Sequence, residues 1–484
     1  MKDKMTPRHR LRWLPLLVIG IAAAIAACSP EGRLINRMTV AQSGEALTQA
    51  DVDRILVQAV SEAQSVQTPC VAAVVDRQGE VLGVFVMQGR DVNNDGTVDS
   101  ISEADIQTAI SKAATAAAFQ SEQEAFTTRT AFFIVQGHYP PNVLNTAAGP
   151  LFGVQDSGMP SSDVHIVAFD QNGNGCGTGI SGVLGGVPLY KNQTPVGGIG
   201  ISTVAVVQTR ASATDPALSP TLISPVQNEL DEAVARAASR DFEAPFVIEA
   251  TNLFVDGIQF PFFGTTKPFA PGDIASSTTS IDASVGAVDV RFPVRPSPFA
   301  EVRVGGQYGL ATARVDVAGV DALNSSTIIA AGTPAERYLG RVVARSSATF
   351  NGTFTNVDRP LQVMFDPVFY RFRNVPVRTM TQANLGGGQG EIRTPFIDGV
   401  EPPPAEGGLT SAEVQSIIDA AAGNARLSVA GIRLPRGVNV VVHIAVCDAR
   451  GNNLGVYRMG DGTQFSHDIA IQKARTAAFF SSDG

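Results

Sequence analysis

Several features that define common functional classes are scarce or absent in this sequence. It has one tryptophan, Trp13, and four cysteines among 484 residues. Beyond the N-terminal segment, Cys70, Cys176 and Cys447 do not have the spacing of a metal site, and their odd number gives no closed disulfide framework. Cys70 and Cys447 lie in apolar, strand-like runs, so we expect buried thiols there.

Basic clusters are also absent beyond the N-terminal segment. The formal net charge is −9, of which the first 27 residues contribute +4, so the remainder is acidic. Because nucleic-acid binding depends on basic patches, we expect no nucleic-acid partner. A Ser/His/Asp order, a P-loop, a dinucleotide fingerprint, zinc spacing and a CxxCH haem-attachment motif are all missing. Nothing in the sequence therefore requires an enzyme, and we favour a non-catalytic protein.

The N-terminal residues predict export and a membrane anchor. Five basic residues precede an apolar run over 14–27, which is short for a bilayer span and has the layout of a secretory signal. The sequence Ile25-Ala26-Ala27-Cys28 resembles the bacterial lipobox, which implies cleavage before Cys28 and attachment to a membrane through acyl chains on it. The alternative is an ordinary signal with a chance cysteine. We assign 1–27 to the signal and 28–45 to a tether. Ser29 after the cysteine resembles Gram-negative lipoproteins of the outer membrane, so we expect a cell-envelope protein.

The chain repeats a helix, a hairpin and a second helix. The stretch LTQADV at 47–52 matches LTSAEV at 409–414, each with a threonine N-cap and an acid three residues later. An apolar strand, an Asp, a Gly three residues on and a return strand follow at 71–87 and 443–459. A helix rich in small residues comes next in both. We therefore expect both stretches to encode the same packed unit.

The second copy ends directly after its second helix, whereas the first continues through residues that would supply the rest of its sheet. A half-domain would expose an apolar sheet face and unpaired strand edges. We expect either a truncated chain, which we favour, or a partner that completes the second copy.

These segments resemble the GlcG/HbpS family of small haem-associated domains. The resemblance rests on the helix start, the AVVDRQGEVLGVFVM hairpin, the KAATAAAF helix, GPLF at 149–152, and the pair GGVPLY and VGGIGI at 185–190 and 196–201. It covers residues 46–240 and, in part, 408–484. It implies an α+β fold in which an antiparallel sheet is flanked by helices, here duplicated. It also implies homo-oligomeric assembly and a small-molecule ligand, with haem as the favoured cofactor.

An insertion in the first copy, which the second copy lacks, predicts a calcium loop of the D-x-N-x-D-G-x-x-D pattern. The candidate ligands are Asp91, Asn93, Asp95, Thr97 and Asp99. Alternate side-chain oxygens and one backbone carbonyl are hard ligands that suit calcium, and the glycine permits the sharp bend. Ser102 stands where such loops usually carry a bidentate acid. The alternative is a solvated polar turn.

Other residues of the first copy are candidates for the ligand pocket. They are Lys112, Thr115, Arg129, His138, Gly197, Gly198 and Gly200. The glycines would let a ligand approach backbone amides, the arginine would pair with a carboxylate or propionate, and the histidine is the best axial haem ligand. The alternatives are a solvated lysine, a packed threonine, an ordinary ion pair and a tight strand turn.

Residues 241–385 predict a β-rich segment of unrecognised type between the copies. Its strand-like runs are Phe246–Ala250, Ala300–Val304, Tyr338–Val343 and Val363–Arg373. The glycines at 386–390 and the prolines at 402–404 indicate a linker over 386–407.

The leading hypothesis is a cell-envelope lipoprotein that binds a small ligand, with haem favoured, through its GlcG/HbpS-like domain. Two alternatives come from other classes: a surface interaction or assembly protein without a cofactor, and an enzyme that acts on haem or a small metabolite.

Overall fold

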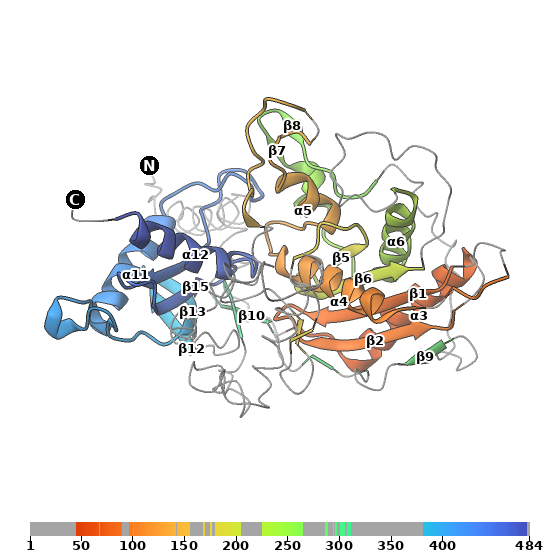
Figure 1. Ribbon diagram of the computed structural model, residues 1–484, viewed down its shortest axis with the longest axis horizontal. Helices are drawn as coiled ribbons and strands as arrows, with labels where there is room; N and C mark the ends of the chain where they lie inside the picture. Colours follow the sequence, from red (N-terminus) through yellow and green to blue (C-terminus); the bar gives the residue numbers. More distant parts are fainter. Residues whose placement is uncertain are drawn as a thin grey trace, which may run out of the picture.

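The computed structural model contains two antiparallel sheets flanked by helices, one on each side of the view in Figure 1. The residues that the structure describes are 45–66, 68–89, 96–99, 101–141, 143–154, 168–169, 175–176, 180–204, 225–264, 286–288, 294, 296–297, 301–304, 307–310 and 381–481. The predicted signal, the tether and Cys28 lie outside them. Within these ranges, no helix has the length and apolar character that a bilayer crossing requires.

The first sheet has the strand order β5-β6-β1-β2-β9, and all its neighbours are antiparallel. Its strands are β1 (Cys70–Asp76), β2 (Val81–Met87), β5 (Gly186–Lys191), β6 (Thr194–Thr203) and β9 (Gly286–Val288). The sheet is buried on both faces, and every residue of β6 is buried. Strands covered on both sides read as continuous apolar runs, as the sequence VAAVV in β1 does.

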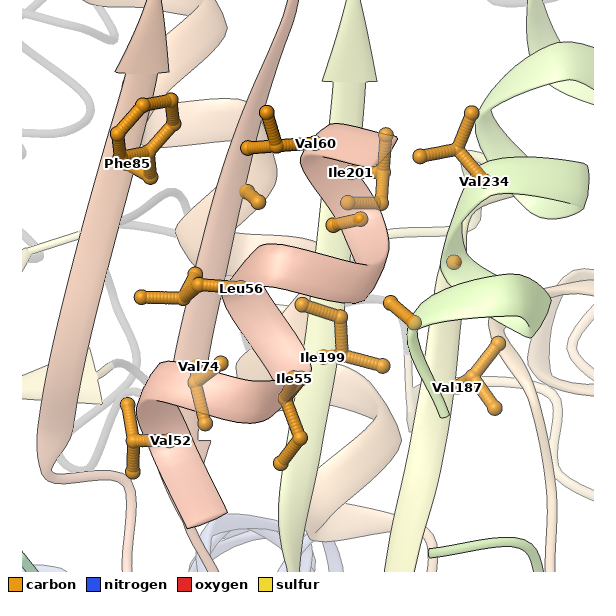
Figure 2. Close-up of a cluster of buried hydrophobic side chains, with 14 of the residues drawn as sticks. Val52, Ile55, Leu56, Val60, Val74, Phe85, Val187, Ile199, Ile201 and Val234 are labelled. Carbon is orange, nitrogen blue, oxygen red and sulfur yellow. The ribbon is translucent and has the colours of Figure 1, made fainter. Parts of the chain in front are cut away.

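Helices cover both faces of this sheet. Helix α4 (Glu103–Ala118) packs its alanines against the face that carries Val71, Ala73 and Val75. Helices α3 (Gln49–Ser65) and α6 (Pro225–Ala238) cover the opposite face. Figure 2 shows Val52, Leu56 and Val60 of α3 directed at the strands, because residues three or four apart share one side of a helix.

The second sheet has the order β12-β13-β15-β14. Its elements are β12 (Thr381–Leu385), β13 (Gly388–Thr394), α11 (Ser411–Ala425), β14 (His443–Cys447), β15 (Asn453–Met459) and α12 (Ser466–Phe479). Helix α11 begins with a capping box between Thr410 and Glu413, as α3 does between Thr48 and Asp51. We call residues 45–310 the first segment and residues 381–481 the second segment. Both therefore contain a helix, a hairpin and a helix in that order.

The two hairpins share a local irregularity. The strand register shifts between Val74 and Val75 in the first and between Val446 and Cys447 in the second. In each, the following aspartate accepts two backbone N–H bonds through Oδ1, from Gln78 and Glu80 or from Arg450 and Asn452.

The expected linker over 386–407 is wrong for residues 388–394, because these form strand β13. Gly386 and Gly387 have φ of +61° and +76°, and they connect β12 to β13 by a two-residue turn. Positive φ at both central residues is what a type I′ hairpin turn requires. Strands β12 and β13 precede α11 in the chain. Strand β13 pairs with β15, just as β9 pairs with the corresponding strand β2 of the first sheet. In the described part of the chain, β14 is an edge strand of this sheet.

The expected strand at Phe246–Ala250 is also wrong. The structure has two short 3-10 helices there, η2 (Phe246–Ile248) and η3 (Ala250–Asn252). Proline before the run and hydrogen bonds from Ile248 N to Pro245 O and from Asn252 N to Glu249 O close local turns instead of a ladder. The strand-like run at Ala300–Val304 contains β10, whereas the predicted strands at Tyr338–Val343 and Val363–Arg373 lie outside the described residues.

Smaller elements complete the described fold. They are α5 (Thr128–Ile134), β3 (Ala168–Phe169), β4 (Gly175–Cys176), β7 (Phe254–Val255), β8 (Ile258–Gln259), β10 (Glu301–Val304), β11 (Gln307–Leu310) and η5 (Pro404–Glu406). Helix α5 and the β7–β8 hairpin share a second apolar core with Leu434 and Phe465 of the second segment. The rings of Phe119 and Phe465 stack at 4.4 Å, so the two segments are packed directly on each other.

Candidate functional site

Two of the three candidate glycines, Gly198 and Gly200, lie under helix α4, and Gly197 lies against β1. A Cβ at Gly200 would overlap the carbonyl oxygen of Ala109, one at Gly198 would overlap that of Ala113, and one at Gly197 would overlap that of Val75. Their missing side chains therefore let α4 and β1 approach the strand closely. This corrects the expectation that these glycines open space for a ligand, since the protein's own backbone fills it.

Lys112 of α4 is buried and fully engaged inside the protein. Its Nζ donates to Asp231 Oδ2 at 2.6 Å and to the Ile201 carbonyl at 2.8 Å. Asp231 also accepts bonds from the Thr203 amide and hydroxyl at 2.8 and 2.6 Å. Burial raises the pKa of Asp231, and the Lys112 ammonium partly opposes that shift. The solvated-lysine alternative is therefore wrong for Lys112, which braces α4 against α6.

Thr115 lies one turn further along α4 and is also buried. Its hydroxyl donates to the Ser111 carbonyl at 2.8 Å and accepts the Ser181 amide at 2.7 Å. Thr115 thus fixes the chain that enters β5.

Arg129 of α5 faces α6. Its Nε and Nη2 both lie 2.8 Å from the carboxylate oxygens of Glu232, the bidentate geometry of a strong ion pair. The Arg129 side chain keeps 21% of its surface exposed, whereas Glu232 keeps 4%. The ion-pair interpretation is confirmed for the described state.

His138 stands apart from these residues, in the loop after α5. Its ring is exposed, and Phe152 and Leu144 in the same loop expose 57% and 71% of their surface. Beneath the loop, Tyr139 contacts the rings of Phe133 and Phe260 edge-on at 5.6 and 6.4 Å. The loop, which we call the His138 loop (137–153), therefore carries an exposed imidazole and two exposed apolar side chains, and its Tyr139 packs on Phe133 and Phe260.

The predicted calcium ligands are only partly within the described residues. Asp91, Asn93 and Asp95 lie outside them. Thr97 is exposed and Asp99 is half-exposed. Ser102 is the N-cap of α4: its hydroxyl accepts the Asp105 amide, and Asp105 bonds back to Ser102. The residues the structure describes contain no group of three or more His, Cys, Asp or Glu side chains that could hold a metal.

The thiols of Cys70 and Cys447 are unreactive in character. Cys70 is buried, and burial raises the pKa of its thiol strongly. Cys447 is half-buried, and burial raises the pKa of its thiol to about 11.

Sequence reasoning missed Asp231 and Glu232, the partners of Lys112 and Arg129. The available signal was an acidic pair that directly precedes the apolar residues Ala233, Val234 and Ala235 in the helix sequence ELDEAVARAA. Buried carboxylates are rarely found without a cationic partner, so such a pair indicates buried cations elsewhere.

Comparisons with known proteins locate this region in a family. The family described as haem degrading protein HbpS-like matches residues 47–215. PduOC, known from the crystal structure of a PduOC:heme complex, has 20% sequence identity with this chain. The match covers 42% of this chain and 98% of the PduOC chain, with a TM-score of 0.25. ORFY of Klebsiella pneumoniae is 19% identical over 42% and 96%, with a TM-score of 0.25, and HbpS is 18% identical over 42% and 93%, with a TM-score of 0.24. No curated protein matches. The motif resemblance is thereby confirmed as a match of the HbpS-like family to residues 47–215.

Proposed function

We propose that this protein is a cell-envelope lipoprotein whose HbpS-like domain binds haem. The observation that carries the proposal is the family match over residues 47–215, since the family is described as haem-degrading. The PduOC neighbour, whose structure is a haem complex, supports the same ligand class.

The His138 loop is the best-placed surface for such a ligand. Haem binding requires an axial donor and apolar contact with the porphyrin face. His138 is exposed in the same loop as the exposed Phe152 and Leu144, whereas the buried Lys112 and Thr115 are satisfied by protein groups. Arg129, with one fifth of its side chain exposed, is the candidate for a propionate.

A haemin titration of the full chain without its signal tests this proposal. We expect a saturable Soret shift at micromolar haemin, and a binding at least tenfold weaker in His138→Ala. His467→Leu is the matched control, because His467 is buried in the second segment. No Soret shift in the wild type would refute haem binding, and an equal shift in His138→Ala would refute the role of this loop.

A catalytic version of the same function is favoured by the family description. Under that alternative, bound haemin with oxygen and a reductant loses its Soret band and releases a product. A stable Soret band under these conditions would exclude haem degradation and leave binding.

The membrane anchor is a separate part of the proposal. It rests on the lipobox-like sequence before Cys28. We expect the wild-type protein in the membrane fraction and Cys28→Ser in the soluble fraction. Equal partitioning would argue against lipidation.

An assembly function without a cofactor is favoured by one observation. Phe479 and Phe480 of the second segment expose 50% and 89% of their surface, at the end of α12. Large exposed apolar side chains are typical of contact surfaces. If they hold copies of this chain together, Phe480→Ser will lower the oligomeric mass measured by light scattering without lowering the melting temperature.

A further inference from the structure

Strand β14 of the second segment corresponds to strand β1 of the first, but its surroundings differ. In the first sheet, β1 pairs with β2 on one side and with β6 on the other. In the second sheet, β14 pairs with β15, and no described strand lies on its other side. The described part of the chain therefore leaves one side of β14 open, at the place where the first segment has β6.

The backbone of β14 directs hydrogen-bonding groups toward this open side. Directly before β14, the Val442 carbonyl accepts the amide of Met459 in β15. Alternate residues of an antiparallel strand direct their N–H and C=O groups to opposite sides. The N–H and C=O groups of Ala445 and Cys447 therefore point away from β15. A row of such groups at a sheet edge is a template for the addition of a further strand.

Helix α12 packs beside β14 as α4 packs beside β1. Ile471 of α12 shares an apolar cluster with Ala445, as Ile110 of α4 does with Ala73. Helix α4 also packs on β6, which is the neighbour that β14 lacks among the described residues. The side of α12 that corresponds to this contact therefore faces the open side of β14.

Lys473 of α12 is the counterpart of Lys112, whose ammonium group holds β6. The Nζ of Lys112 donates to the Ile201 carbonyl of β6 at 2.8 Å and to Asp231 Oδ2 at 2.6 Å. Lys112 is 1% exposed, whereas Lys473 is exposed. A strand added to β14 would bring a carbonyl to Lys473 in the same way, and a carboxylate beside that strand would match its charge.

The first segment also shows which kind of strand fits beneath such a helix. On β6, Gly198 and Gly200 face α4, and a Cβ at either position would overlap a backbone carbonyl of that helix. Ile199 lies between them and points into the core on the opposite face. By the register of β6 on β1, a strand that pairs with β14 in the same way would place glycines opposite Ala445 and Cys447.

We propose that the open side of β14 and the adjacent face of α12 bind an extended segment of a partner protein. This segment has glycine at alternate positions, apolar residues between them and a carboxylate for Lys473. A second copy of this chain fits less well, because its β6 is already paired with β1 and β5, and its β14 would bring side chains to the positions that require glycine. The site lies in the second segment and is independent of haem binding at the HbpS-like domain.

The probe is a fluorescent peptide with the β6 sequence, Thr194–Thr203, extended by aspartates. It is added to the full chain without its signal, and we expect a saturable rise in anisotropy at micromolar peptide. A second peptide, with valine in place of Gly198 and Gly200, should bind at least tenfold more weakly. No saturable binding of the glycine peptide, or equal binding of both peptides, would refute the proposal.

Ala445→Pro is the matched variant of the protein. It removes an amide that points away from β15, and edge strands tolerate proline at such positions. An added strand would lose a hydrogen bond and meet the proline ring, so we expect the affinity for the glycine peptide to fall at least tenfold. Asn384→Pro, at an exposed position of β12 on the opposite edge of the sheet, is the control and should leave the affinity unchanged. Equal affinity in Ala445→Pro and the wild type would overturn the assignment.

If Ala445→Pro does not fold, hydrogen exchange in the wild type decides. The glycine peptide must slow exchange at the amides of Ala445 and Cys447 and leave β12 unchanged, and unaltered exchange in β14 refutes the site. Light scattering tests the other occupant: a wild-type dimer that becomes a monomer in Ala445→Pro would show a second copy at this edge and overturn the partner assignment. The haemin titration on the same proteins reports separately on the HbpS-like domain.

Discussion

Lys112 and Lys473 occupy corresponding places in α4 and α12, yet their surroundings are opposite. Lys112 is 1% exposed and paired with Asp231, whereas Lys473 is exposed. The difference arises because α4 packs on β5 and β6 and Asp231 of α6 reaches Lys112, whereas no described element takes their place beside α12.

This pair gives a prediction at the residue scale. Lys112→Met leaves the Asp231 carboxylate buried without its counter-charge, so we expect a loss of about 3–5 kcal/mol in the free energy of unfolding. Lys473→Met, at the exposed position, should change it by about 0.5 kcal/mol or less. Urea unfolding of both variants measures this. Equal effects would contradict the buried brace.

Asp76 and Asp448 cap the two hairpins but differ at their second oxygen. Asp76 Oδ2 accepts the Ser297 hydroxyl at 2.9 Å, whereas Asp448 Oδ2 accepts Val400 N, Glu401 N and Asn452 Nδ2. Burial, reinforced by Glu80, raises the pKa of Asp76 from 3.8 to about 7. Protonated Asp76 therefore stabilises the fold below pH 4, and this contribution is lost as the pH rises through 7.

Replacing the two aspartates by asparagine separates these roles. Asp76→Asn cannot ionise, so its stability relative to the wild type should increase between pH 4 and pH 8. Asp448→Asn loses acceptor capacity toward three donors and should destabilise the protein at pH 7 by about 1–3 kcal/mol. Chemical unfolding across that pH range tests both. A constant difference between Asp76→Asn and the wild type would contradict the raised pKa.

The recurrence of Lys112 was visible in the sequence, but its function was not. Its partner Asp231 lies 119 residues later, on a helix that has no equivalent among the described residues of the second segment. Local patterns predict local structure, whereas a long-range ion pair depends on how elements pack. The role of His138 as an axial haem ligand stays a prediction for the same reason, because the sequence does not show which residues its loop contacts.

At the scale of elements, the close contact between α4 and β6 depends on glycines. Adding a methyl group at Gly200 would overlap the backbone of Ala109 and Ala113 in α4, which cannot move as a flexible side chain would. We expect Gly200→Ala to cost about 1–3 kcal/mol or more through displacement of the helix. Gly431→Ala is the control, since no atom lies within 4 Å of its added methyl group. Equal melting temperatures of the two variants would contradict this packing.

Capping boxes and hairpins could be predicted because their signals are local. Thr48 with Asp51 and Thr410 with Glu413 cap helices where the sequence placed them. The glycines at 386–387 could not be assigned in the same way, because a flexible linker and a two-residue turn have the same composition. Only the pairing of β12 with β13 distinguishes them.

The calcium loop is also a prediction at this scale, since it inserts between β2 and α4. Calcium should raise the melting temperature of the wild type, because a ligand that binds only the folded state stabilises it. Asp95→Ala should abolish that rise by removing a hard oxygen ligand. A melting temperature insensitive to calcium in both proteins would leave the polar-turn alternative.

At the scale of the whole molecule, the two segments are joined through a buried ionic contact. Arg433 of the second segment lies 3.2 Å from Asp461 and 3.4 Å from Glu124 of the first, and its side chain is 4% exposed. Glu122 of the first segment also donates its amide to Asp461 at 3.0 Å. The sequence could not predict this contact, because it depends on how the two copies pack and not on either copy alone.

Removing Arg433 should uncouple the segments. Arg433→Met leaves Glu124 without its nearest cation, and we expect a loss of about 3–5 kcal/mol. The effect should be largest at the contact. Arg433→Met should therefore accelerate backbone hydrogen exchange more in residues 430–467 than in β1 and β6. Arg450→Met is the matched control: its ion pair with Glu401 is 75% and 54% exposed, and such pairs contribute about 0–1 kcal/mol. If exchange in 430–467 responded equally to both variants, the contact of Arg433 with Glu124 and Asp461 would have no part in coupling the two segments.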